Sequence, residues 1–71
     1  MKLVLEVAGA ETVIGDWFDF ETAYDWATEH AEQNDWSEEF NYILTDDAGE
    51  RWFIECDAWI SETDLNATHS I

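Results

Sequence analysis

FETAYDWATEHAEQ, residues 20–33, decides how this chain of 71 residues folds. Its apolar positions recur at helical spacing and form one face, which consists of Phe20, Ala23, Tyr24, Ala27 and Ala31. The opposite face is acidic and consists of Glu21, Asp25, Glu29 and Glu32. The stretch therefore predicts an amphipathic helix that begins near Asp19, a residue type favoured as an N-cap.

The acidic face of this helix repels itself. Glu21, Asp25 and Glu29 follow one another four residues apart, a spacing at which like charges destabilise a helix by a few tenths of a kcal/mol per pair. The stretch contains no lysine or arginine that would offset the repulsion. We therefore interpret the acidic face as a surface kept for binding.

Alternating apolar residues on both sides of the helix predict strands. Residues 2–8, KLVLEVA, form one strand, and residues 12–17, TVIGDW, form either its hairpin partner or an extended entry into the helix. Residues 39–45 and 50–58 form a second hairpin around the turn at residues 46–49, DDAG. The predicted fold is α+β, a small two-layer sandwich in which an antiparallel sheet of three to four strands, in ββαββ or βαββ order, packs on one helix.

Length and composition indicate a single domain. Hydrophobic residues make up 46% of the chain, which is too many for a disordered acidic tail. Residues 1–58 are predicted to form one compact acidic domain, and residues 59–71 a C-terminal tail or short cap. No signal peptide or membrane span is expected. The single cysteine, Cys56, is expected to be a buried strand residue and fits a cytoplasmic location, that of the host cell if the protein is encoded by a phage.

The chain contains 18 aspartates and glutamates but only two basic residues, which gives a net charge of -16. Direct binding of nucleic acid or of an anionic membrane is excluded, because binding to phosphates needs lysine and arginine. No catalytic motif is present, so the protein is not expected to be an enzyme, and no cofactor is predicted. Asp46, Asp47 and Glu50 could form a weak calcium site, but turn residues chosen for backbone geometry are the favoured reading, and no metal site is predicted.

The size of the charge matches a short piece of DNA. Duplex DNA carries about one negative charge per 1.7 Å, so sixteen charges correspond to roughly eight base pairs, or about 27 Å of duplex. A compact chain of this length has an expected diameter of roughly 29 Å. Carboxylates four apart on a helix, about 6 Å, or two apart on a strand, about 6.6 Å, approach the spacing of successive phosphates. We expect one such row on the helix and a shorter one at Glu55 and Asp57.

Five tryptophans are more than so small a core can bury, so some are expected to be exposed and to anchor a partner. Trp52 is expected in the core, whereas Trp26 lies at the edge of the apolar face of the helix. The predicted partner-binding residues are Glu21, Asp25, Trp26, Glu29, Glu32, Asp35, Trp36, Glu38, Glu39, Glu55 and Asp57.

In size, acidity, scarcity of basic residues and compact α+β pattern, the sequence is similar to the small DNA-mimic proteins that phages and mobile elements use against restriction, CRISPR or repair nucleases. The resemblance implies an inhibitor that occupies the nucleic-acid-binding cleft of a basic protein, such as a nuclease or a CRISPR or restriction effector. Two alternatives remain open: an acidic protein–protein interaction module that uses exposed tryptophans, and an ordinary domain of a halophile. A homodimer is possible and would extend the negative surface.

Overall fold

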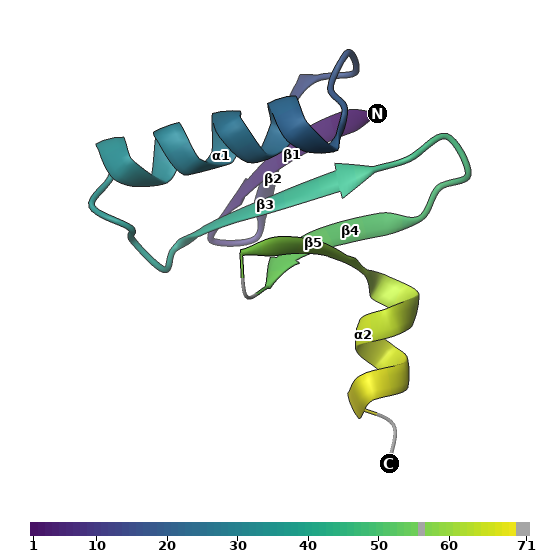
Figure 1. Cartoon of the computed structure of the whole chain (residues 1–71). Coiled ribbons are helices and arrows are strands. Elements are labelled where there is room, and N and C mark those ends of the chain that lie inside the picture. Colours follow the sequence, from purple (N-terminus) through teal and green to yellow (C-terminus); the bar gives the residue numbers. More distant parts are fainter. Residues whose placement is uncertain (56, 70–71) are drawn as a thin grey trace.

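The structure is a computed structural model that describes residues 1–55 and 57–69, the last two without their side chains. Its elements, in chain order, are β1 (Lys2–Val7), β2 (Ala10–Gly15), α1 (Phe20–Gln33), β3 (Phe40–Thr45), β4 (Arg51–Glu55), β5 (Ala58–Ser61) and α2 (Glu62–His69). Figure 1 shows α1 lying along one face of the sheet, while α2 extends away from the opposite side.

All five strands belong to one antiparallel sheet with the order β2-β1-β3-β4-β5. The helix α1 connects β2 to β3 and so passes over β1, which lies between them. The predicted α+β sandwich is confirmed, with five strands in place of three to four and with a second helix. Of the two predictions for residues 12–17, the hairpin is confirmed, because β1 and β2 pair antiparallel. The turn residues Ala8 and Gly9 both have positive φ (54° and 83°), as a type I′ turn requires.

The segment predicted as a C-terminal tail or cap begins as a strand of the sheet and continues as a helix. Its first residues form β5, in which Trp59 lies opposite Ile54 and Ser61 opposite Trp52 of β4. The strand is only four residues long, and its adjacent Trp59 and Ile60 do not show an apolar–polar alternation, which is why the pattern missed it. The expectation of burial for Cys56 lies outside the described residues.

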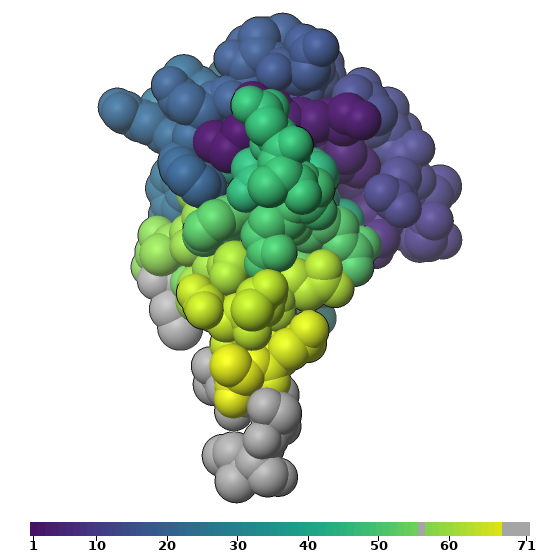
Figure 2. All heavy atoms as spheres, turned by 90° about the vertical axis from the view of Figure 1, so that its right-hand side faces the viewer, coloured from purple at the N-terminus to yellow at the C-terminus, as the bar shows by residue number. Residues whose placement is uncertain are grey.

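The helix α2 continues directly from β5. The hydroxyl of Ser61 accepts a hydrogen bond from the backbone N–H of Asp64 at 3.2 Å, in the manner of an N-cap. The guanidinium of Arg51 in β4 donates two hydrogen bonds to Glu62, at 2.7 and 3.0 Å. This bidentate pair lowers the pKa of Glu62 and raises that of Arg51. These contacts attach the first turn to the sheet, and Figure 2 shows α2 as a protrusion below the body of the molecule.

The core lies between α1 and the sheet. Leu3 and Leu44 lie opposite each other on β1 and β3, are fully buried, and contact Phe18 and Ala23. Trp52 packs against this cluster, as predicted. Small residues at positions 23, 27 and 31 bring the helix close to the sheet, and all three are buried. The prediction of a buried Phe20 is wrong: this residue is 41% exposed, because it is the first residue of the helix, where its ring meets Trp52 in a T-shaped contact.

The sheet face turned away from α1 has a different character. Strand alternation places Val4 and Ile43 on it, and both are buried, although no helix covers them as α1 covers the other face. Lys2 and Arg51 both lie on this face, in register with Thr45 between them. Both basic residues of the chain are therefore on the side opposite α1. Within the described part of the chain, no helix is long and apolar enough to cross a membrane.

Candidate partner-binding surface

The acidic helix is fixed at its first residue by a reciprocal cap. The Asp19 carboxylate accepts the backbone N–H of Thr22 at 2.8 Å, and the Thr22 hydroxyl accepts the backbone N–H of Asp19 at 3.0 Å. The hydrogen bond from the Thr22 backbone lowers the pKa of Asp19. The expected N-cap is thus present at Asp19.

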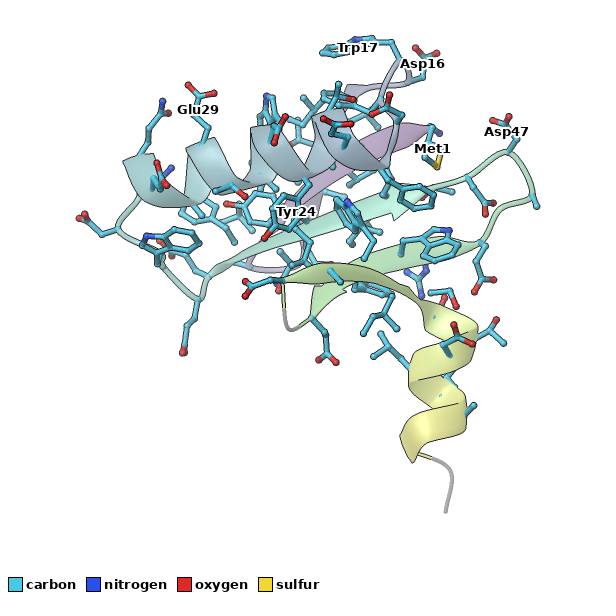
Figure 3. The ribbon with its side chains drawn as sticks, viewed as in Figure 1. Met1, Asp16, Trp17, Tyr24, Glu29 and Asp47 are labelled. Atoms are coloured by element: carbon cyan, nitrogen blue, oxygen red, sulfur yellow. The ribbon has the colours of Figure 1, made fainter. Side chains whose placement is uncertain are left out.

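The outward face of α1 is formed by carboxylates. Glu21, Asp25, Glu29 and Glu32 are all exposed. At 3.6 residues per turn they fall within about 80° of arc, opposite the buried alanines. Figure 3 shows Glu29 pointing away from the sheet. The structure therefore places the four predicted helix residues together, in one row along the helix.

The connection from α1 to β3 continues this acidic surface. The helix ends with two hydrogen bonds that point back into its last turn, from the Asp35 N–H to the Glu32 carbonyl at 3.3 Å and from the Trp36 N–H to the Ala31 carbonyl at 2.7 Å. Asp35, Glu38 and Glu39 are exposed. Residues 20–39 thus carry seven carboxylates and no lysine or arginine.

Trp26 is half-buried at the border of the acidic face. Its ring stacks on His30, with centroids 5.0 Å apart and planes 11° from parallel. His30 Nδ1 in turn lies 2.8 Å from the Tyr42 hydroxyl, and its ring meets the edge of Phe40. Trp26 also lines a shallow groove of about 180 Å³ beside Glu29. The ring is therefore held in place by its neighbours and remains partly exposed.

Trp17 is the residue that sequence reasoning missed. It is 69% exposed, and its indole stacks on Phe18 with centroids 3.9 Å apart. Phe18 is buried and contacts Ala23, the arrangement called a hydrophobic staple, in which the residue before an N-cap packs inward. The sequence contained this signal, an apolar Phe18 directly before the expected N-cap Asp19. A staple directs Phe18 into the core, and the preceding Trp17 then points outward. Figure 3 shows Trp17 and Asp16 on the same side of the molecule as Glu29.

Glu55 and Asp57 do not form the predicted second row. Glu55 is the last residue of β4, and the strand register places it on the face away from α1. Asp57 lies in the turn between β4 and β5, with a φ of 64°, and lines a cleft beneath α1. The expectation was wrong because it continued the strand alternation through a residue that turns the chain. Asp57 therefore lines the same cleft as Trp36, whereas Glu55 lies on the other face of the sheet.

The turn at residues 46–49 uses its first carboxylate for structure. Asp46 accepts the N–H groups of Ala48 and Glu50, each at 2.9 Å, and the indole N–H of Trp52 at 3.1 Å. The hydrogen bond from Trp52 is the main cause of the lowered pKa of Asp46. Over residues 1–55 and 57–69, no group of three histidine, cysteine or acidic side chains is arranged to hold a metal ion.

No protein-family model, curated protein or solved structure matches this chain. The function is therefore inferred from the surface itself.

Proposed function

We propose that this domain is an acidic DNA-mimic inhibitor that occupies the nucleic-acid-binding cleft of a basic protein, a nuclease or a CRISPR or restriction effector, in the cytoplasm of a host cell. Binding requires no catalysis and no cofactor. The acidic helix and the connection after it, residues 20–39, form the contact surface, and Trp17 and Trp36 lie at its borders.

The absence of cations from the acidic helix and the connection after it carries this proposal. Seven carboxylates occupy residues 20–39, whereas Lys2 and Arg51 lie on the opposite face of the sheet and Arg51 is paired with Glu62. Fourteen residues make α1 about 21 Å long, the length of roughly six base pairs of duplex. A basic groove that neutralises this row removes the self-repulsion of the helix, so the repulsion that opposes folding favours binding.

A second candidate is an acidic interaction module that binds a partner away from its nucleic-acid site. The specific observation in its favour is that Trp17 and Trp36 are 69% and 63% exposed, and exposed tryptophans are common anchors of protein interfaces. In this case the tryptophans would supply most of the affinity, and the carboxylates would set the rate and specificity of association.

The experiment that separates these functions is affinity capture from a candidate host lysate on the immobilised domain, with duplex DNA as competitor and elution in salt steps. We expect a nucleic-acid-binding protein that DNA displaces and that moderate salt elutes. A captured protein that duplex DNA does not displace would support the interaction module and contradict mimicry.

A further inference from the structure

A cleft of about 210 Å³ opens between α1 and the strands β3 and β4. Its walls include three aromatic side chains from separate elements, Tyr24 of α1, Trp36 of the α1–β3 connection and Tyr42 of β3. Figure 3 shows Tyr24 on the underside of α1, directed toward the sheet. One carboxylate, that of Asp57, lies at the rim. Pockets for drug-sized ligands span roughly 300–1,000 Å³, so this cleft has the size for a single side chain.

One of its walls is held in a strained backbone conformation. Trp36 has a φ angle of 56°, in the left-handed region that bulky residues rarely adopt, whereas Asp57, with a φ of 64°, is of a residue type that tolerates this region. The Trp36 N–H donates to the Ala31 carbonyl at 2.7 Å, which holds this conformation while the indole stays 63% exposed. A large ring kept in strained backbone and open to solvent is typical of a binding site.

A second aromatic wall, Tyr42, is held in place by its neighbours. The Tyr42 hydroxyl lies 2.8 Å from His30 Nδ1, and the Trp26 ring meets Tyr42 at 73° with centroids 6.3 Å apart. Burial raises the pKa of Tyr42, so the phenol remains neutral at physiological pH. The ring can therefore accept a ligand without first being ordered, which reduces the entropic penalty of binding.

The lining selects a planar cation. Faces of tryptophan and tyrosine attract cations, and a guanidinium also stacks on them because it is flat and weakly hydrated. A carboxylate at the rim can accept two parallel N–H bonds from it. Both basic residues of the chain lie on the other face of the sheet, so neither competes for this position. We propose that the cleft receives one arginine side chain of the basic partner.

This inference deepens the proposed function and rests on it only for the origin of the arginine, so it can be tested without a partner. The probes are N-acetyl-arginine amide and its neutral isostere N-acetyl-citrulline amide, titrated at constant ionic strength into the ¹⁵N-labelled domain. We expect saturable shifts at the indole of Trp36 and the amide of Asp57, with affinity for the arginine probe about tenfold higher than for citrulline.

Two variants and one control complete the test. Trp36→Ala should abolish the shifts, and Asp57→Asn, which tolerates a positive φ, should weaken binding about tenfold. Glu11→Gln removes the same charge from the exposed edge strand β2 and should leave the affinity unchanged. Equal binding of citrulline, an equal loss in Glu11→Gln, or shifts only along the outer face of α1 would overturn the proposal. None of these results would affect capture of a DNA-displaceable partner, so the two proposals fail separately.

Discussion

The indole of Trp17 lies directly over the α-carbon of Gly15. A Cβ at position 15 would be 3.0 Å from Cδ1 of Trp17 and closer still to its Nε1, so only glycine leaves room for the ring. The ring is thereby folded back against the end of β2 and stacked on Phe18. A residue that is 69% exposed is thus held in one position, which is the property of a good interface anchor.

Gly15→Ala should displace the Trp17 ring and weaken partner binding while leaving the domain folded. Hot-spot residues contribute about 2 kcal/mol or more, so Trp17→Ala should raise Kd by roughly 30-fold, and Gly15→Ala by a smaller factor. Isothermal titration with the captured partner measures both, and circular dichroism checks the fold. Unchanged affinity in Trp17→Ala would remove this residue from the interface.

Charge reversal on α1 should slow association. Asp25→Lys with Glu29→Lys places two cations in the middle of the acidic row, and we expect the association rate to fall at least about tenfold, because steering of this kind changes rates by 10- to 1,000-fold. The matched control is Glu11→Lys with Asp47→Lys, which changes the net charge equally at two exposed positions outside α1. Stopped-flow kinetics at low salt measures the rates. Equal slowing in both variants would mean that only the total charge matters.

Salt should act oppositely on folding and on binding. Raising ionic strength from 0.02 to 1 M shortens the screening length to about 3 Å, which relieves self-repulsion and raises Tm but slows association with a basic partner. We expect the domain to be folded already at 0.02 M salt, as circular dichroism would show. A chain that is unfolded at low salt and folds only in molar salt would point to the ordinary domain of a halophile.

The cap of α1 should make stability depend on pH in a defined window. The folded-state pKa of Asp19 is lowered from its ordinary value of 3.8, so its stabilising effect is complete above 3.8 and is lost as pH falls through the lower folded value. Asp19→Ala should therefore have a lower Tm than the parent at pH 7 and an equal Tm at the acidic end of the range. Asp19→Asn keeps a hydrogen-bond acceptor that does not titrate. The difference in Tm between Asp19→Asn and Asp19→Ala should therefore not change with pH. A gap between parent and Asp19→Ala that persisted at pH 2 would contradict this account.

The contact between Leu3 and Leu44 should be the most sensitive part of the core. Leu44→Ala is expected to destabilise the domain by about 3 kcal/mol, a large share of the roughly 4–11 kcal/mol available to a chain of this size. Val13→Ala, at a position that is 57% exposed on β2, should change stability by less than about 0.5 kcal/mol. Urea denaturation measures both free energies, and similar losses in the two variants would argue against the described core.

The sequence predicted the elements with a strong period and missed those without one. The repeat of Ala23, Ala27 and Ala31 predicted the extent of α1 and the residues of its acidic face, because helical periodicity is repeated over fourteen positions. The strand β5 has four residues and no alternation, and its pairing depends on a turn that contains Asp57 at positive φ. Non-local pairing of this kind is decided by the fold and cannot be found in a local pattern.

The candidate site could likewise be predicted only in part from the sequence. The carboxylates of α1 could be placed together from their spacing, since helix geometry fixes neighbours four residues apart. Glu55 and Asp57 could not, because a single backbone turn sends them to different sides of the sheet. The cleft beneath α1 joins Tyr24, Trp36 and Tyr42 from three elements, and only the packed structure brings them together.

Lys2 and Arg51 lie on the sheet face opposite α1, where they offset part of the negative charge of Glu6, Glu11 and Glu55. Residues 20–39 contain no cation, so the negative charge is weighted toward α1, which adds an electric dipole moment to the net charge. A net charge draws the domain toward a cationic surface, whereas the dipole moment exerts a torque that rotates it on the way. Rotation of this kind would turn α1 toward the cationic partner before the two proteins touch. Moving the two cations to the α1 side, at constant total charge, would weaken the torque, so approach would be less strongly oriented even though the attraction remained.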